Sequence, residues 1–204
     1  HDKLREGILE ELDDAQKRVL HEQIAQKMEQ VYPGAMEHAA ALVYHWHHAG
    51  NTAKEAHYAL IAGDQAMQQG ANRQATEFFE AATAAFERLP EAPETQRQYI
   101  DTVVKLSRVG AFHMRGSGAS LKAQLERALQ LAKSLGDEVR EAYALGSIGA
   151  HLYVRGELGP AIGYFMQVIS LAEKLGLEEL LMVPYNIMAR VFVLSGDLPK
   201  ALPM

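Results

Sequence analysis

Leu131-Ala132-Lys133-Ser134-Leu135-Gly136 is the stretch that decides the fold, because 40 residues later the chain returns to it as Leu171-Ala172-Glu173-Lys174-Leu175-Gly176. Three further glycines, Gly116, Gly156 and Gly196, follow one another at the same 40-residue spacing and alternate with Gly136 and Gly176. A helix stop favours glycine, since the stopping residue takes a positive φ. A 40-residue unit divided into two helices by alternating glycines predicts a helical-hairpin repeat.

The earlier part of the chain also reads as helices separated by Gly and Pro, with no period-2 pattern typical of a strand. Asp13 and Gln16 have the spacing of a capping box, which predicts a helix from there to about Val31. The helices that follow are predicted to end at Ala49, to run from Ala53 to Gln69, and to start at an N-cap on Asn72. Pro90-Glu91-Ala92-Pro93 interrupts the pattern and is the predicted sub-domain boundary.

These elements predict an all-α fold, an α-α superhelix of about ten helices built from antiparallel helical hairpins in a right-handed solenoid. We expect three parts: a helical segment over 1–31, first helical repeats over 35–89, and repeats of 40-residue period over 94–204. The first residues lack Met and open inside a helical pattern, and the last follow the start of a helix. Both ends are therefore expected to be cuts through a longer protein, with the last repeat truncated.

Composition limits the function. The formal net charge is −6, which argues against a nucleic-acid surface, and the absence of cysteine removes thiolate nucleophiles and zinc–thiolate sites. It also fits a reducing, cytoplasmic compartment. The sequence contains no run of 18 apolar residues, so no membrane-spanning helix is predicted. We therefore expect no membrane partner and no direct nucleic-acid contact.

The repeat resembles the tetratricopeptide pattern. In the best-preserved unit, large and small apolar residues stand at its packing positions: Leu145, Ile148, Gly149 and Leu152 in the first helix, and Ala161, Phe165 and Val168 in the second. The next unit places Tyr185, Met188, Ala189 and Phe192 at the first-helix positions, with Ala201 after them. The small residues would let helix backbones approach, and the large ones would fill the space between hairpins.

The whole chain resembles a narrower group, the helical-repeat region of bacterial signal-transduction ATPases with numerous domains, which includes relatives of the maltose-regulon activator. The resemblance rests on His1, Leu4-Arg5-Glu6, Leu12, Lys17-Arg18, Leu20-His21 and Ile24-Ala25, which look like the end of a winged-helix region. It extends over Ala41-Leu42-Val43-Tyr44-His45-Trp46, Phe86-Glu87-Arg88-Leu89-Pro90 and Leu125-Glu126-Arg127-Ala128-Leu129.

This resemblance implies a non-catalytic protein-interaction or sensor segment of a multidomain signalling or transcription-regulating protein. Its partner would be another protein or the upstream ATPase domain of the same chain. The chain has no G-x-x-x-x-G-K-[ST] motif, so ATP chemistry is not carried over to any residue, and no cofactor is expected. Two alternatives stay open: a small-molecule inducer sensor of a LuxR-type transcription activator, and an uncharacterised enzyme.

The candidate binding residues follow from the tetratricopeptide-like arrangement, in which the first helix of each hairpin lines a concave groove. The predicted groove positions are Tyr143, Gly146, Ala150 and Tyr153 in one unit, Val183, Asn186, Arg190 and Val193 in the next, and Gly110, His113 and Met114 in the unit before. Of these, His113, Tyr143, Tyr153, Asn186 and Arg190 carry polar groups, and Tyr and Arg are frequent interface anchors. The alternative is that some of them pack against an adjoining domain.

Two other clusters are interpreted as structural. His45 and His48 lie at i, i+3 and could share a helix face, but no clear third ligand accompanies them, so no metal site is predicted. Paired carboxylates such as Asp13-Asp14 and Glu178-Glu179 stand at predicted helix starts or on polar faces, where the helix dipole favours acidic residues. No catalytic residue is predicted.

Overall fold

The computed structural model of the chain describes residues 12–32, 36–110 and 118–194. Within these ranges every regular element is a helix, and inside each of the two units described below successive helices pack against each other. The chain divides into two compact units, His1–Glu91 and Ala92–Met204, which we name the first and second unit. The border between them lies inside Pro90–Pro93, the segment at which the sequence pattern breaks. In the structure, the described residues 12–31 belong to the same unit as 36–89.

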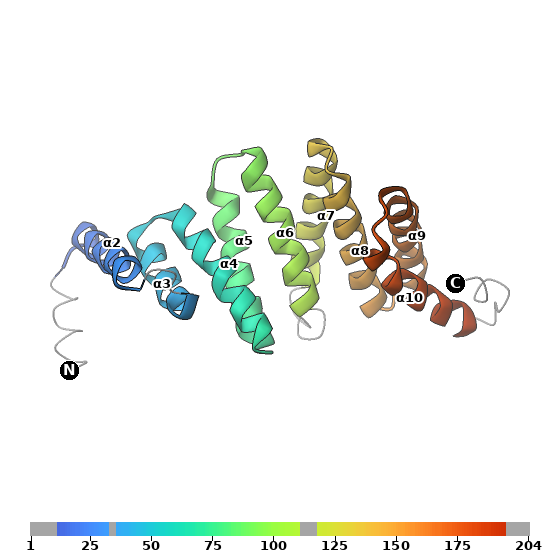
Figure 1. Cartoon of the computed structure of the whole chain (residues 1–204), viewed down its shortest axis with the longest axis horizontal. Coiled ribbons are helices and arrows are strands. Elements are labelled where there is room, and N and C mark those ends of the chain that lie inside the picture. The colour runs from blue at the N-terminus through green and yellow to red at the C-terminus, as the bar shows by residue number, and fades with distance from the viewer. Residues whose placement is uncertain (1–11, 33–35, 111–117, 195–204) are drawn as a thin grey trace. The chain divides into compact units, whose positions relative to one another are not determined.

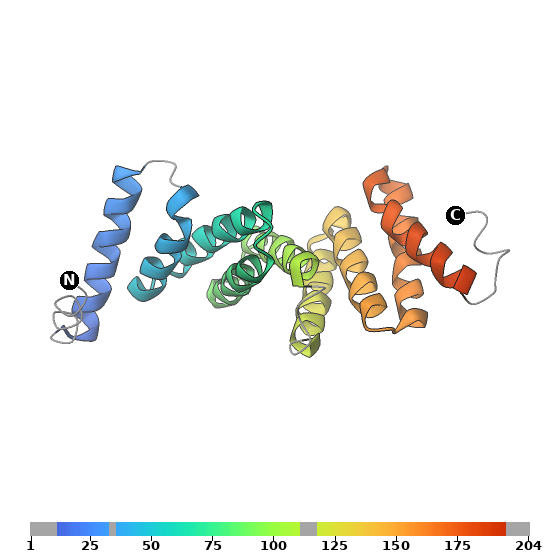
Figure 2. The same cartoon turned by 90° about the horizontal axis from the view of Figure 1, so that it is seen from below.

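The first unit contains four α-helices and one 3-10 turn in its described residues. They are α2 (Asp14–Val31), η1 (Met36–His38), α3 (Ala39–Ala49), α4 (Thr52–Gln68) and α5 (Asn72–Arg88). Each helix contacts the next one along the chain, and the direction of the chain reverses at each short connection (Figures 1 and 2).

The second unit continues the pattern with α6 (Pro93–Gly110), α7 (Gly118–Leu135), α8 (Glu138–Val154), α9 (Leu158–Leu175), η2 (Glu178–Leu180) and α10 (Met182–Leu194). Beyond the contacts between successive helices, α6 also contacts α8, so the first helices of neighbouring hairpins pack side by side. This all-α array of antiparallel hairpins confirms the predicted fold class. No helix in the described ranges is long and apolar enough to cross a membrane.

Glycine ends the helices as the 40-residue spacing predicts. Gly136, Gly156 and Gly176 have φ values of 64°, 80° and 70°. At each of them the following residue donates its N–H to a carbonyl five residues back, at 2.9–3.0 Å, as in a Schellman motif. Only a residue without Cβ takes this φ at little cost, so the glycine period sets where each helix stops. Gly116 and Gly196 lie outside the described residues.

The second helix of each hairpin buries one repeated stripe of side chains. The stripe follows i, i+4, i+7 and i+11, which places its members on a single helix face. It consists of Ala75, Phe79, Ala82 and Phe86 in α5, of Leu121, Leu125, Ala128 and Ala132 in α7, and of Ala161, Phe165, Val168 and Ala172 in α9. The packing positions predicted on α8, Leu145, Ile148, Gly149 and Leu152, are buried as well.

One helix start differs from the sequence prediction. The N-cap of α5 is Ala71, whose side chain cannot cap, and Asn72 is instead the first helical residue. After Gly176 the chain begins with the 3-10 turn η2, and its N-cap Leu177 makes no side-chain hydrogen bond. The predicted capping box of Asp13 and Gln16 is formed, with bonds of 2.8 and 3.0 Å.

One carboxylate joins three helices of the first unit. Glu29 of α2 accepts hydrogen bonds from Trp46 Nε1 of α3 at 3.0 Å, from Tyr58 Oη of α4 at 2.8 Å and from Lys54 Nζ at 2.9 Å. Burial alone would raise the pKa of Glu29, but these hydrogen bonds and the Lys54 charge outweigh it and lower the pKa. Burial and the bond to Glu29 raise the pKa of Tyr58 to about 12.

The raised pKa of Tyr58 predicts that the first unit loses stability in alkali. An unfolded tyrosine ionises near pH 10, whereas folded Tyr58 keeps its proton to about 12. Between these values the unfolded chain binds fewer protons, so the free energy of unfolding falls as pH rises. The free energy of unfolding is measured in urea at pH 9 and pH 11.5 by the fluorescence of Trp46. Its drop between the two pH values should be roughly 1 kcal/mol larger in wild type than in Tyr58→Phe. Equal drops in both proteins would contradict the assignment.

Candidate functional site

A groove of about 420 Å³ opens in the second unit. Its wall residues come from five elements and are mostly apolar. They are Val104, Ser107 and Arg108 of α6, Tyr143, Gly146, Ser147 and Ala150 of α8, Phe165 and Val168 of α9, Glu179 and Leu180 of η2, and Val183 and Pro184 of α10. The volume lies within the range of sites that hold small ligands or side chains of a partner.

The hollow exists because α8 presents small residues where it faces the groove. Gly146 and Ala150 are one helical turn apart and therefore lie on the same face. A Cβ added to Gly146 would meet only Val168 Cγ2, at 3.8 Å, which leaves the space in front of it open. Behind this face lie Phe165 and Val168 of α9, which are 0% and 1% exposed. The floor of the groove is thus apolar and held by the hairpin core.

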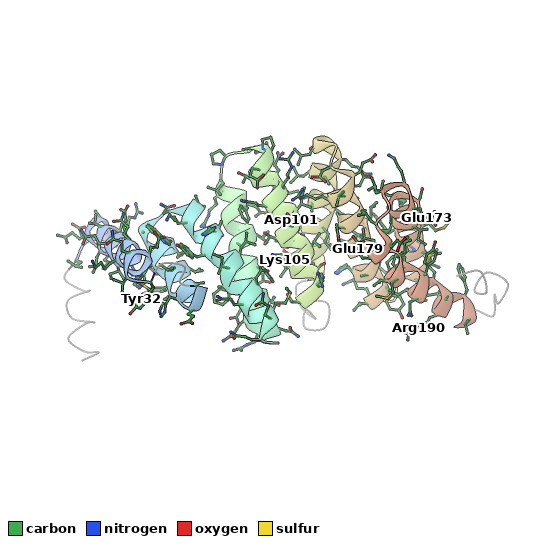
Figure 3. All side chains as sticks on the ribbon, in the orientation of Figure 1. Tyr32, Asp101, Lys105, Glu173, Glu179 and Arg190 are labelled. Atoms are coloured by element: carbon green, nitrogen blue, oxygen red, sulfur yellow. The ribbon has the colours of Figure 1, made fainter. Side chains whose placement is uncertain are left out.

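The rim carries the polar groups. Tyr143 donates from its hydroxyl to Glu179 Oε1 at 3.4 Å, which joins α8 to η2. Burial raises the pKa of Tyr143, and the charge of Glu179 adds to this, while Arg108 acts in the opposite direction. Arg108 is exposed at the end of α6 and forms no ion pair with a described residue. Figure 3 labels Glu179, with Lys105 and Asp101 on the neighbouring α6.

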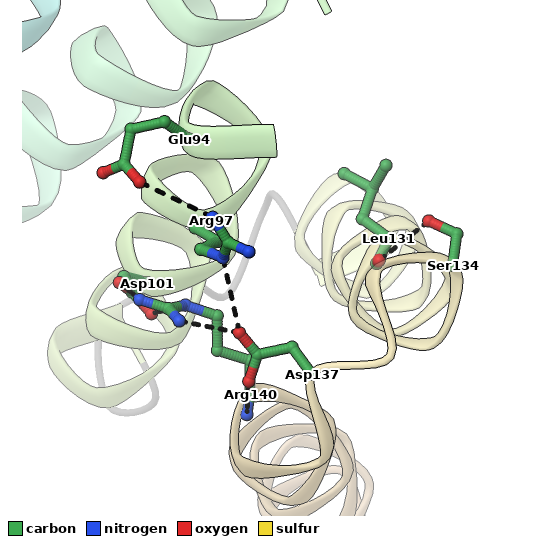
Figure 4. Close-up of polar contacts among 7 residues, drawn as sticks. All are labelled: Glu94, Arg97, Asp101, Leu131, Ser134, Asp137 and Arg140. Carbon is green, nitrogen blue, oxygen red and sulfur yellow. Dashed lines mark hydrogen bonds and ion pairs between the residues drawn. The ribbon is translucent and has the colours of Figure 1, made fainter. Parts of the chain in front are cut away.

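A charge network fixes α6 against α8 and so holds two walls of the groove. Arg140 of α8 donates from Nε and a terminal nitrogen to the two carboxylate oxygens of Asp101 at 2.9 and 2.8 Å (Figure 4). Its other terminal nitrogen donates to Asp137 at 2.8 Å, and Arg97 lies 3.7 Å from the same carboxylate. These contacts, the bond to Asp101 first, raise the pKa of Arg140, and a bidentate pair of this kind also fixes orientation.

The same network explains the start of α8. Asp137 is the N-cap and accepts from the backbone N–H of Arg140 at 3.1 Å. Burial would raise the pKa of Asp137, but the hydrogen bonds and charge of Arg140 lower it, with a further contribution from Arg97. The carboxylate therefore stays ionised and serves the helix start and the α6 contact together.

The hydroxyl of Ser107 does not point to nucleophilic chemistry. It donates to the backbone carbonyl of Val104 within α6, at 2.7 Å, as serine commonly does inside helices. Ser147 contributes a second hydroxyl to the lining. A hydrolytic nucleophile needs a base within hydrogen-bond reach, and Glu179, the carboxylate of the lining, accepts from the Tyr143 hydroxyl while Ser107 donates to Val104. The arrangement suits reversible binding of an apolar group.

The structure brings together part of the sequence-predicted groove. Tyr143, Gly146, Ala150 and Val183 line one hollow, although they come from two different 40-residue units. The remaining predicted residues do not line it. Tyr153 is partly buried further along α8, Asn186 and Arg190 are exposed on α10 with Val193, and Gly110 ends α6. Arg190 is labelled in Figure 3. His113 and Met114 lie outside the described residues.

Sequence reasoning missed the contribution of α6. It placed the groove positions of this unit at and after Gly110, whereas the structure uses Val104, Ser107 and Arg108, about one to two turns earlier. Their i, i+3, i+4 spacing marks a common helix face and was the available signal. Which face of α6 meets α8 depends on the packing of neighbouring hairpins, which the sequence pattern does not specify.

The histidines of the first unit form a packed cluster. The Nδ1 atoms of His21 in α2 and His45 in α3 are 2.9 Å apart, so one ring donates and the other accepts. The ring of His48 stacks on His21 with centroids 4.9 Å apart, and its Nδ1 lies 2.8 Å from the carbonyl of Tyr44. No group of three potential ligands in the described part of the chain has metal-site geometry.

No known family model matches this chain, and no curated protein matches its sequence. The groove and its rim therefore supply the argument for function.

Proposed function

We propose that this chain is a non-catalytic protein-interaction and sensor segment, and that the groove of the second unit holds an apolar side chain of a partner segment. The observation that carries the proposal is the apolar hollow in front of Gly146, with Phe165 and Val168 behind it. Helical-repeat proteins bind along the surfaces that their hairpins build, because each repeat contributes one strip of the surface.

The wider context of the proposal rests on the resemblance described above. A segment of this kind would belong to a multidomain bacterial signalling or transcription-regulating ATPase in the cytoplasm. Its partner would be a separate protein or the upstream ATPase domain. Binding would act by changing the packing between neighbouring hairpins, since repeat arrays bend at the interfaces between repeats.

The test fills the groove without straining the fold. Gly146→Leu places a side chain in the hollow from a helical position that has room for it. Gly163→Leu is the matched control, because Gly163 lies exposed on α9 with nothing within 4 Å of an added Cβ. Random 12-residue peptides displayed on phage are selected on the wild-type chain and then tested on both variants.

We expect the selected peptides to bind Gly146→Leu at least tenfold more weakly than wild type and to bind Gly163→Leu unchanged. The reason is that an occupied hollow excludes the apolar anchor, which supplies most of the binding energy at such interfaces. Peptides that bind all three proteins equally would show that the groove is not the binding site.

A second candidate is the small-molecule sensor, favoured by one observation. A half-enclosed volume of about 420 Å³ with few polar groups is typical of pockets for small organic ligands. A thermal-shift screen against metabolites and sugars would test it, since a ligand at a hundredfold excess over its Kd stabilises by about 2.7 kcal/mol. A shift that disappears in Gly146→Leu but persists in Gly163→Leu would favour this candidate over the peptide.

A further inference from the structure

We infer that the partner segment is acidic as well as apolar: an Asp or Glu carboxylate beside its apolar anchor pairs with Arg108 at the rim of the groove. This inference rests on the proposed function and adds to it the chemistry and the orientation of the occupant. Neither charged residue of the groove mouth, Arg108 or Glu179, forms an ion pair with a described residue, but Glu179 has a hydrogen-bond donor facing it and Arg108 has no hydrogen-bond acceptor among the described residues.

The two charged residues that line the groove differ in what they contact. Glu179 accepts a hydrogen bond from the Tyr143 hydroxyl at 3.4 Å, so a donor of this chain already faces it. Arg108 lies on the α6 side, is exposed, and forms no ion pair with a described residue. A guanidinium has five N–H donors and no acceptor, and a carboxylate matches two of them at once. The rim group that lacks a partner, and that a ligand would bind, is therefore the Arg108 guanidinium.

The walls of the groove restrict where the carboxylate of the partner segment can lie. The interior of the groove is formed by buried apolar side chains such as Phe165 and Val168, where an unpaired charge is strongly disfavoured. On the η2 side, Glu179 would repel a second carboxylate. An acidic side chain would therefore lie toward α6, while the apolar anchor enters the hollow in front of Gly146. The rim thus specifies which way round the segment binds.

The same geometry separates Arg108 from the other candidate cation. Arg190 is exposed on α10 but does not line the groove. A charge that sits outside the lining contributes little to the choice of partner, because exposed charges are screened within about 10 Å at 0.1 M salt. Arg190 therefore provides the control: replacing it changes the charge of the chain in the same way as replacing Arg108, but outside the groove lining.

The experiment asks whether reversing one charge reverses the preference. Random 12-residue peptides on phage are selected in parallel on wild type, Arg108→Glu and Arg190→Glu. Wild type and Arg190→Glu should both enrich peptides with Asp or Glu next to an apolar residue. Arg108→Glu should lose this enrichment and recover Lys or Arg at the same place, because specificity at a rim follows attraction and repulsion together. Circular dichroism confirms that each variant is folded.

The size of the effect is measured on the most enriched wild-type peptide. Arg108→Gln should weaken it by about two- to fivefold at 0.1 M salt, as expected for an exposed ion pair. The difference from wild type should shrink at 0.5 M salt. Groove-dependent peptides with no acidic enrichment, or equal enrichment on Arg108→Glu, would overturn this inference and leave the proposed function standing. If no peptide depends on Gly146, both are overturned.

Discussion

Replacing Phe79 by alanine is expected to lower the free energy of unfolding of the first unit by about 3–5 kcal/mol, the usual cost of emptying a buried aromatic site. Phe79 of α5 is 0% exposed and lies directly over Gly63 of α4. A Cβ added to Gly63 would lie 2.5 Å from Phe79 Cε1, which shows how closely the ring is held.

Trp46 provides the measurement. It is the single tryptophan of the chain and is buried in the first unit with Ala25 and Leu42, so its fluorescence in urea follows this unit alone. Phe78→Ala is the matched control, because the neighbouring ring is only partly buried and should lose clearly less. Equal losses in Phe78→Ala and Phe79→Ala would contradict the role assigned to the Gly63 contact.

Gly149→Ala should destabilise the second unit by about 1–2 kcal/mol, although alanine favours a helix over glycine by roughly 1 kcal/mol. The new Cβ would lie 2.7 Å from Phe165 Cε1, and Phe165 is 0% exposed and cannot move aside. The same exchange at Gly163 of α9 meets nothing within 4 Å and should instead stabilise by about 0.5–1 kcal/mol. Urea unfolding followed by circular dichroism compares the two.

A double variant tests the cause. Gly149→Ala and Phe165→Leu should each destabilise alone, but together they should cost less than the two losses added, because the smaller side chain makes room for the new methyl group. Simple additivity would show that Gly149 matters for another reason than the ring above it.

The two predictions concern one packing arrangement, a glycine under an aromatic ring, that occurs in both units. Gly63 precedes Phe79 by 16 residues, and Gly149 precedes Phe165 by 16 residues. In each hairpin the glycine of the first helix lies under the aromatic ring of the second. The sequence analysis identified Gly149 as a close-packing position and left Gly63 unnoticed, because the 40-residue period is clear only in the second half of the chain.

The helix boundaries were predictable because local chemistry determines them. Gly136, Gly156 and Gly176 end helices through a backbone conformation that other residues adopt only with strain. The capping box of Asp13 and Gln16 depends only on the side chains and backbone N–H groups of these two residues. The start of α5 was wrong by one residue, since Asn72 was predicted as a cap that Ala71 provides without a side-chain bond. Caps without a side-chain acceptor leave no signal in the sequence.

By itself, then, the sequence determined that this chain is an all-α array of helical hairpins, where its helices stop, and which face of α8 carries small residues. Those features depend on residues close together in the chain. Only the tertiary structure decided that Arg108 of α6 and Glu179 of η2 lie at the mouth of the hollow behind which Phe165 packs. Their proximity depends on how neighbouring hairpins pack and on the bond between Arg140 and Asp101, 39 residues apart, and no local pattern encodes such a contact.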